Sequence, residues 1–154
     1  MKIKKVYWIL GIFILITAGV GYYFFGASGT KFKTSFIKIG EVGFEVEVAD
    51  TLGARMKGLS GREVLGENEG MLFVFSSSGD QGFWMKDMKF SIDIVWIQDD
   101  EIVGFEENVQ PVEGKSVFGL KIYHPPEPVN KVLEVKAGMV KKYGFQAGDI
   151  IVIQ

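Results

Sequence analysis

An uncharged apolar run over residues 6–25 constrains this chain more than any other feature of its sequence. As a helix with a rise of about 1.5 Å per residue, the run spans roughly 30 Å, the thickness of a bilayer's hydrocarbon core. Aromatic residues stand at both ends, Tyr7 with Trp8 and Tyr22 with Tyr23, where their rings favour the headgroup region. The run therefore predicts a transmembrane helix.

A cleavable signal peptide is the alternative for this segment. The apolar part of such a peptide usually covers only about 7–15 residues, and the best small-residue cleavage site, at residues 27–29, is a poor one. Three lysines precede the run and two follow it, which favours a cytoplasmic N-terminus. We therefore expect a cytoplasmic end at 1–5, an uncleaved single-pass anchor in the cell membrane at 6–25, a flexible tether at 26–35 and an extracytoplasmic domain at 36–154.

The charge and the residue types of the chain exclude several classes of function. Residues 1–33 hold five lysines and no acid, so the remaining 12 basic residues and all 19 acids give residues 34–154 a net charge of −7. A body of this charge repels phosphate, and no nucleic-acid partner is expected. The chain has no cysteine and a single histidine, His124, which leaves no thiolate or histidine-rich metal site. We predict no metal and no cofactor.

Several short segments after the anchor have the pattern of β-strands. Apolar and polar residues alternate, as at 44–48, or form compact apolar runs, as at 71–75. Strands are expected on both sides of a turn at 40–41, within residues 36–48, and at 71–75, 90–97, 102–105, 129–135 and 150–153, with a polar loop at 106–115. Together with two short helices, they predict a mostly β (α+β) domain with a small barrel-like antiparallel sheet.

The two helices are expected at residues 52–59 and 137–143. In the first, Leu52, Met56 and Leu59 have the spacing i, i+4, i+7, which places them on one face. We predict that these three side chains form the buried stripe of that helix.

Eight segments of the chain together resemble one known family. They are residues 48–51 (VADT), 54–55 (AR), 58–62 (GLSGR), 70–75 (GMLFVF), 83–88 (FWMKDM), 92–94 (IDI), 132–138 (VLEVKAG) and 148–149 (GD). In order and spacing they resemble the domain of unknown function 192 family of small bacterial and archaeal proteins, many of them membrane-attached or secreted. The resemblance implies a mostly β, barrel-like fold with one or two short helices. It implies no established reaction, cofactor or catalytic set.

Trp84 is the first candidate for a ligand-binding residue. Phe83, Trp84 and Met85 are adjacent, and alternation along an extended chain sends some of this bulk away from the core. An outward tryptophan beside Lys86 is a natural platform for a sugar face or a planar group. The alternative is that Trp84 plugs one end of a small barrel and Lys86 is merely solvated.

Asp93 is the second candidate, because it interrupts an apolar strand. If it is buried, its carboxylate needs a partner, and Arg55, Arg62 and Lys86 are the cations available. In the functional interpretation, Asp93, Arg55 and Lys86 surround a polar pocket for an anionic or hydroxyl-rich ligand. Arg62 follows Arg55 by seven residues and shares its helix face if the helix continues that far. The alternative is a structural ion pair or a carboxylate that caps a turn.

These observations favour a membrane-anchored, extracytoplasmic binding module without catalytic activity. Its partners are the bilayer, through residues 6–25, and a cell-envelope ligand such as a glycan, or a partner protein. One alternative is an envelope hydrolase that uses Asp93 with a second carboxylate, although no Gly-x-Ser-x-Gly motif is present and no catalytic residue is assigned. A structural component of a membrane assembly is the other alternative.

Overall fold

The structure is a computed structural model that describes residues 32–112 and 119–154. The predicted anchor at 6–25 lies outside these residues. Within the described part of the chain, no helix has the length and apolar character needed to cross a membrane. The first strand begins at Lys33, so the last residues of the predicted tether at 26–35 belong to the sheet.

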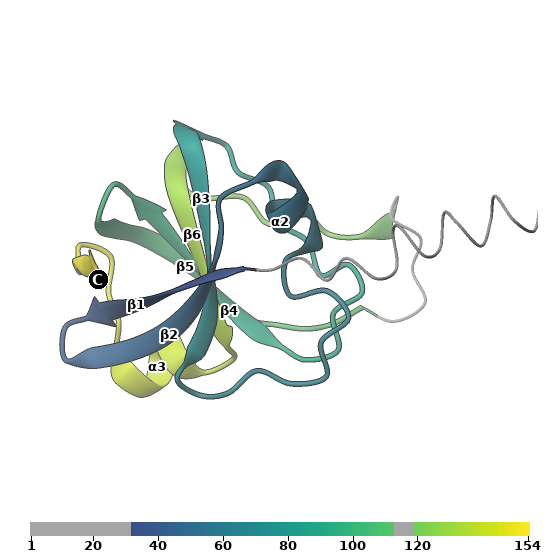
Figure 1. Cartoon of the computed structure of the whole chain (residues 1–154), viewed down its shortest axis with the longest axis horizontal. Helices are drawn as coiled ribbons and strands as arrows, with labels where there is room; N and C mark the ends of the chain where they lie inside the picture. Colours follow the sequence, from purple (N-terminus) through teal and green to yellow (C-terminus); the bar gives the residue numbers. More distant parts are fainter. Residues whose placement is uncertain (1–31, 113–118) are drawn as a thin grey trace, which may run out of the picture. The chain divides into compact units, whose positions relative to one another are not determined.

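Seven strands form one sheet in the order β5-β4-β6-β3-β2-β1-β7. Their bounds are β1 (Lys33–Ile39), β2 (Val42–Ala49), β3 (Glu69–Gly79), β4 (Ile92–Gln98), β5 (Glu101–Val109), β6 (Val129–Lys136) and β7 (Ile151–Ile153). All neighbouring pairs are antiparallel except β2 and β3, which are parallel. A parallel pair needs a crossover connection, and helix α2 (Leu52–Lys57) lies in it (Figure 1).

The two edges of the sheet are bridged at one point among the described residues but do not pair as strands. The sheet is therefore curved into a half-barrel. Glu101 on β5 bridges Ile150, next to β7. The Ile102 N–H donates to the Asp149 carbonyl at 2.9 Å, and the Ile151 N–H donates to the Asp100 carbonyl at 2.8 Å. The predicted mostly β, barrel-like fold with short helices is therefore confirmed at that level, while the parallel pair corrects the expectation of a fully antiparallel sheet.

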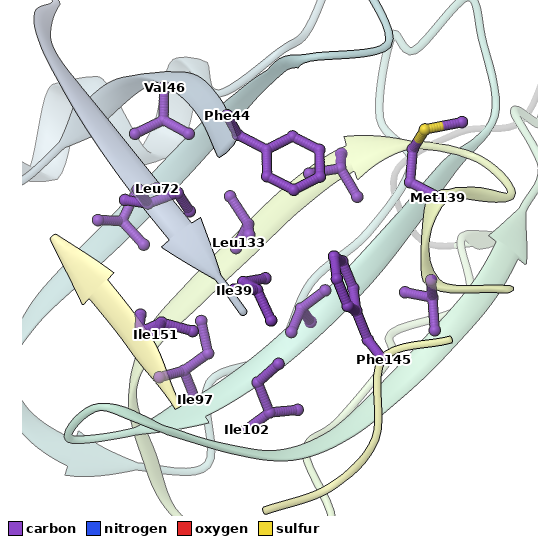
Figure 2. Close-up of a cluster of buried hydrophobic side chains, with 14 residues drawn as sticks. Ile39, Phe44, Val46, Leu72, Ile97, Ile102, Leu133, Met139, Phe145 and Ile151 are labelled. Carbon is purple, nitrogen blue, oxygen red and sulfur yellow. The ribbon is translucent and has the colours of Figure 1, made fainter. Parts of the chain in front are cut away.

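Both faces of the sheet are covered by apolar side chains. One face carries a cluster that is closed by helix α3 (Met139–Tyr143) and the C-terminal segment (Figure 2). There the rings of Phe44 and Phe145 pack edge to face, with their centroids 6.2 Å apart. The other face carries a second cluster, which includes Phe73, Trp96 and residues of α2 and the loop after it. Burial on both faces explains why β4 is apolar almost throughout.

Helix α2 has the predicted position, but its buried stripe is not the predicted one. Ala54 and Leu59 are buried, whereas the side chains of Leu52 and Met56 are 68% and 76% exposed. Since an α-helix turns by about 100° per residue, positions two before and two after Ala54 point away from the face that Ala54 packs on the sheet. The helix also ends at Lys57, because Gly58 adopts a positive φ of 48°.

The predicted polar loop at 106–115 is wrong in its first part. Strand β5 continues to Val109, and Glu106 pairs with Ile94 of β4. Charged residues are tolerated here because β5 is at the edge of the sheet, where one side of the strand remains in water. Helix α3 falls within the predicted 137–143 helix and ends, as expected, at Gly144, which has a φ of 68°.

Candidate functional site

A cavity of about 230 Å³ opens between α2, β3 and residues 81–88. We call it the α2 cavity. Of the five candidate residues from the sequence, Trp84 and Arg55 line it, whereas Lys86, Asp93 and Arg62 do not. Its lining combines aromatic and aliphatic side chains with a few polar groups: Leu52, Arg55, Met56, Lys57, Gly58, Leu59, Ser60, Phe73, Phe75, Gln81, Gly82, Phe83, Trp84, Met88 and Glu134.

Three phenylalanines form the aromatic wall of the α2 cavity. Phe83 packs edge to face on Phe73, with ring centroids 4.8 Å apart, and on Phe75 at 6.4 Å. Phe83 is also tied to Tyr123 by a pair of backbone hydrogen bonds. Trp84, the next residue, also lines the cavity and is 48% exposed, while Met85 is buried. Trp84 therefore does not plug the barrel, and its ring is accessible beside the cavity.

Arg55 is held rigidly in the wall of the cavity by backbone carbonyls. Its Nη1 donates to the Asp50 carbonyl at 2.9 Å and to the Val74 carbonyl at 3.0 Å. Its guanidinium also lies over the Phe75 ring, 5.0 Å from the centroid. A guanidinium has five N–H donors, and within the described residues no acceptor is bonded to Nε or Nη2. Arg55 can therefore receive an anionic or polar group without losing the bonds that fix it.

Glu134 is the lining residue that the sequence analysis missed. It lies in the central strand β6, opposite Met71 of β3 and Ile94 of β4, and is only 5% exposed. Burial raises the pKa of Glu134 to about 8, and the positive charge of Arg62 opposes that rise. Within the described residues no hydrogen bond to its carboxyl group is found. At neutral pH the group is therefore mostly protonated, and it lines the cavity as an unengaged carboxylic acid.

Arg62 is engaged outside the cavity. Its guanidinium binds both carboxylate oxygens of Glu47, at 2.9 and 2.5 Å. It also lies over the Phe32 ring, at 5.6 Å. Because α2 ends at Lys57, Arg62 does not share a helix face with Arg55. The structure thus places the two arginines in separate surroundings.

Asp93 is fully buried, but none of the three cations expected as its partner contacts it. Its Oδ1 accepts a hydrogen bond from the Asn108 N–H at 2.8 Å, and its Oδ2 accepts one from the Val140 N–H at 2.9 Å. Val140 is in the first turn of α3, whose capping residue, Gly138, has no side chain. Backbone donors thus replace the expected arginine or lysine, and Asp93 caps helix α3. The alternative interpretation expected a structural role of this kind, but as an ion pair or a turn cap.

Lys86 is solvated, and it contributes to the site through its backbone. Its Nζ pairs with Asp87 at 2.5 Å, and both side chains are well exposed. Its carbonyl accepts a hydrogen bond from the Ser60 hydroxyl at 2.9 Å, while the Gly61 N–H donates to the Asp87 carbonyl at 2.8 Å. These two bonds fix the segment that carries Trp84 against the end of α2. The structure does not bring Lys86 together with Asp93 and Arg55.

Comparison with known proteins identifies the family. Residues 35–153 match the DUF192 family, described as an uncharacterized ACR. The chain belongs to the DUF192 family. No curated protein matches the sequence of this DUF192 protein.

Two crystal structures are similar to the DUF192 chain. One, from Sinorhizobium meliloti 1021, is described as a "putative transcription regulator"; its TM-score is 0.73 at 27% identity, with 82% of this chain and 98% of that chain covered. The other is a protein of unknown function from Novosphingobium aromaticivorans, with a TM-score of 0.68 at 25% identity, covering 82% of this chain and 88% of that chain. Both therefore share the half-barrel fold with this chain.

Five of the eight segments that carry the DUF192 resemblance contribute residues to the α2 cavity. Residues from 54–55, 58–62, 70–75, 83–88 and 132–138 all line it. These segments are far apart in the sequence, and the sheet with its crossover helix brings them together.

Proposed function

We propose that this DUF192 domain is a non-catalytic binding module that takes an apolar group of its ligand into the α2 cavity. In this proposal the segment at 6–25 holds the module at the outer face of the cell membrane, where the ligand is a cell-envelope molecule or a partner protein. The observation that carries the proposal is the open cavity with its aromatic wall and fixed arginine. A cavity with apolar walls and a few convergent polar groups is typical of binding sites.

Exposed apolar side chains around the cavity support a ligand that extends beyond it. Leu52, Met56 and Trp84 all line the cavity, and all three are largely exposed. We call them the apolar rim. Large apolar side chains gathered at one opening mark an interaction site more often than single exposed residues do. Methionine and tryptophan also suit such contacts, the first by adapting its shape and the second by offering a wide flat face.

Binding is favoured over hydrolysis by the positions of the acids. Asp93 is enclosed and accepts hydrogen bonds from two backbone N–H groups, so a substrate has no access to it. Among the described residues that line the cavity, Glu134 is the only acid, and the nearby Glu47 is occupied by Arg62. A carboxylate pair of the kind that glycosidases use requires two available acids.

The description of the Sinorhizobium relative as a transcription regulator is not transferred to this chain. A net charge of −7 over residues 34–154 opposes binding to a phosphate backbone. The apolar rim and the aromatic wall provide a surface for a hydrophobic or planar group instead. A glycan stacked on Trp84 and an apolar side chain of a partner protein both fit this surface.

The proposal can be tested with the full-length protein in lipid nanodiscs, labelled at its methyl groups. A panel of small aromatic compounds is added, and the methyl resonances of Leu59 and Met88, which line the cavity, are followed by NMR. We expect at least one compound to shift both resonances, and Trp84→Ala to weaken this effect without lowering Tm. Val152→Ala, a change of an exposed residue on β7, is the matched control. If no compound shifts these resonances, or if Trp84→Ala unfolds the domain, the proposal fails.

A further inference from the structure

The charged groups of the α2 cavity define what kind of ligand it can accept. Three ionisable side chains are among the described lining residues: Arg55, Lys57 and Glu134. Lys57 donates through its Nζ to the Ser60 carbonyl at 2.8 Å, so its charge is held near the opening. Arg55 is fixed by two carbonyls and keeps its positive charge at any relevant pH. The cavity therefore contains two fixed cations and a single acid.

Glu134 does not balance these cations at neutral pH. It is 5% exposed between apolar neighbours, and its pKa of about 8 keeps it mostly protonated. Arg62 of the loop after α2 is the charged group that acts on the pKa of Glu134, and it is itself bound to Glu47. Arg55 and Lys57 of α2 line the same cavity, and Asp50, which is paired with Lys33, lies near Arg55. The net charge of this neighbourhood is positive, so a ligand that carries an ammonium group is repelled.

We propose that the α2 cavity binds a small organic carboxylate with an apolar or aromatic body. The ligand's carboxylate accepts hydrogen bonds from the Nε and Nη2 side of Arg55, and Glu134 is the only acid among the described residues that line the same cavity. The body of the ligand packs on the phenylalanine wall, with Trp84 beside the opening. This inference rests on the proposed function, because it names the class of ligand for the same cavity.

The geometry supports this class in two independent ways. Arg55 is held in place by bonds to Nη1 alone, so the donors on its other side are available in a fixed direction. A planar carboxylate matches a guanidinium better than any other common anion except phosphate. The volume of about 230 Å³ is below the roughly 300–1,000 Å³ of sites for drug-sized ligands, so one ring or a short chain is the expected body.

Three compounds of nearly equal shape test the inference on the full-length protein in nanodiscs. Phenylacetate carries the carboxylate, phenylacetamide is its neutral analogue, and phenethylamine is a cation. We expect phenylacetate to bind about tenfold or more tightly than the other two, because charged hydrogen bonds to arginine are lost with them. Equal binding of phenylacetate and phenylacetamide, or a preference for the amine, overturns the inference and leaves the proposed function standing. Failure of all three to bind contradicts both.

Variants separate the roles of the two polar residues. Arg55→Gln is expected to abolish the preference for phenylacetate, while Lys141→Gln, a change of an exposed cation on α3, leaves the preference intact. If Arg55→Gln destabilises the fold, Arg55→Lys is used in its place, because it keeps the positive charge. Arg55→Lys is expected to reduce the preference for phenylacetate in part. For the wild type, affinity for phenylacetate falls above pH 8 as Glu134 loses its proton; in Glu134→Gln this fall is absent. An unchanged preference in both Arg55 variants overturns the inference.

Discussion

The carboxylate of Asp93 on β4 accepts a hydrogen bond from the backbone N–H of Val140 at 2.9 Å, so a strand residue caps α3 from the core. The same carboxylate accepts the Asn108 N–H at 2.8 Å. We predict that Asp93→Ala leaves the Asn108 and Val140 N–H groups without this acceptor and lowers the free energy of unfolding by about 2–5 kcal/mol. Chemical denaturation checks this, with Glu45→Ala, a change of an exposed acid on β2, as the control. A loss no larger than that of the control contradicts the structural role.

Glu134 is predicted to make the stability of the domain depend on pH. Its pKa is about 8 in the folded protein against 4.5 without burial, so the folded state holds a proton that the unfolded state releases. Stability contributed by this group is full below about pH 4.5 and decreases as the pH rises to about 8, by up to roughly 1.4 kcal/mol per pH unit. Denaturation of the wild type and of Glu134→Gln across pH 5–9 measures the difference. Parallel curves for the two proteins contradict this prediction.

The positive charge of Arg62 is predicted to hold down the pKa of Glu134. Arg62 opposes the effect of burial on the pKa of Glu134, so Arg62→Gln raises that pKa further. Arg62→Lys keeps the positive charge and is expected to leave the pKa of Glu134 closer to its wild-type value. NMR titration of the Glu134 side-chain carboxyl carbon measures the pKa in both variants. A pKa in Arg62→Gln no higher than in Arg62→Lys contradicts this role of Arg62.

The apolar rim is predicted to be dispensable for folding. Leu52→Ser and Met56→Ser change exposed side chains, so each alters the free energy of unfolding by no more than about 0.5 kcal/mol. Leu59→Ala removes a buried side chain next to the same helix and is expected to cost about 2–5 kcal/mol. Thermal denaturation of the three variants distinguishes the rim from the core. A large loss of stability in Leu52→Ser supports the buried stripe that the sequence predicted and contradicts the exposed rim.

The membrane topology remains a prediction from the sequence, and it is directly testable. Residues 6–25 are expected to keep the protein in the membrane fraction, with residues 36–154 exposed outside the cytoplasm. In intact spheroplasts, external protease is then expected to remove a C-terminal epitope tag. A tag that is cleaved only after lysis shows that the domain faces the cytoplasm and excludes the extracytoplasmic binding that we propose.

Alternation of side chains is what made the strands predictable. Val46 and Phe44 are buried where Glu45 is exposed, and the turn at 40–41 joins β1 and β2 as expected. The parallel pairing of β2 with β3 was not predictable in this way, because a strand's pattern records which faces are buried and not which neighbour it pairs with. The prediction that Leu52 and Met56 are buried was also wrong, since helical spacing identifies an apolar face without showing what lies against it.

The candidate site was predicted in part, and the reasons differ for each residue. Trp84 and Arg55 do line one cavity. The partners of Asp93 were missed because backbone N–H donors leave no trace in the pattern of side chains. Glu134 was missed although a signal was present: it is an acid within the apolar run 132–135, in a strand with neighbours on both sides. Such an acid in a central strand is rare without a partner, and it is worth singling out.

The pairing of Ile37 on β1 with Ile153 on β7 has a consequence for biogenesis. The first described strand receives its second neighbour from residues 151–153, which follow all the other strands of the sheet in the chain. Until they are synthesised, one long edge of the sheet stays open, and its backbone donors and acceptors can pair with other chains. A nascent chain arrested before residue 151 would therefore be exposed to intermolecular strand pairing at β1.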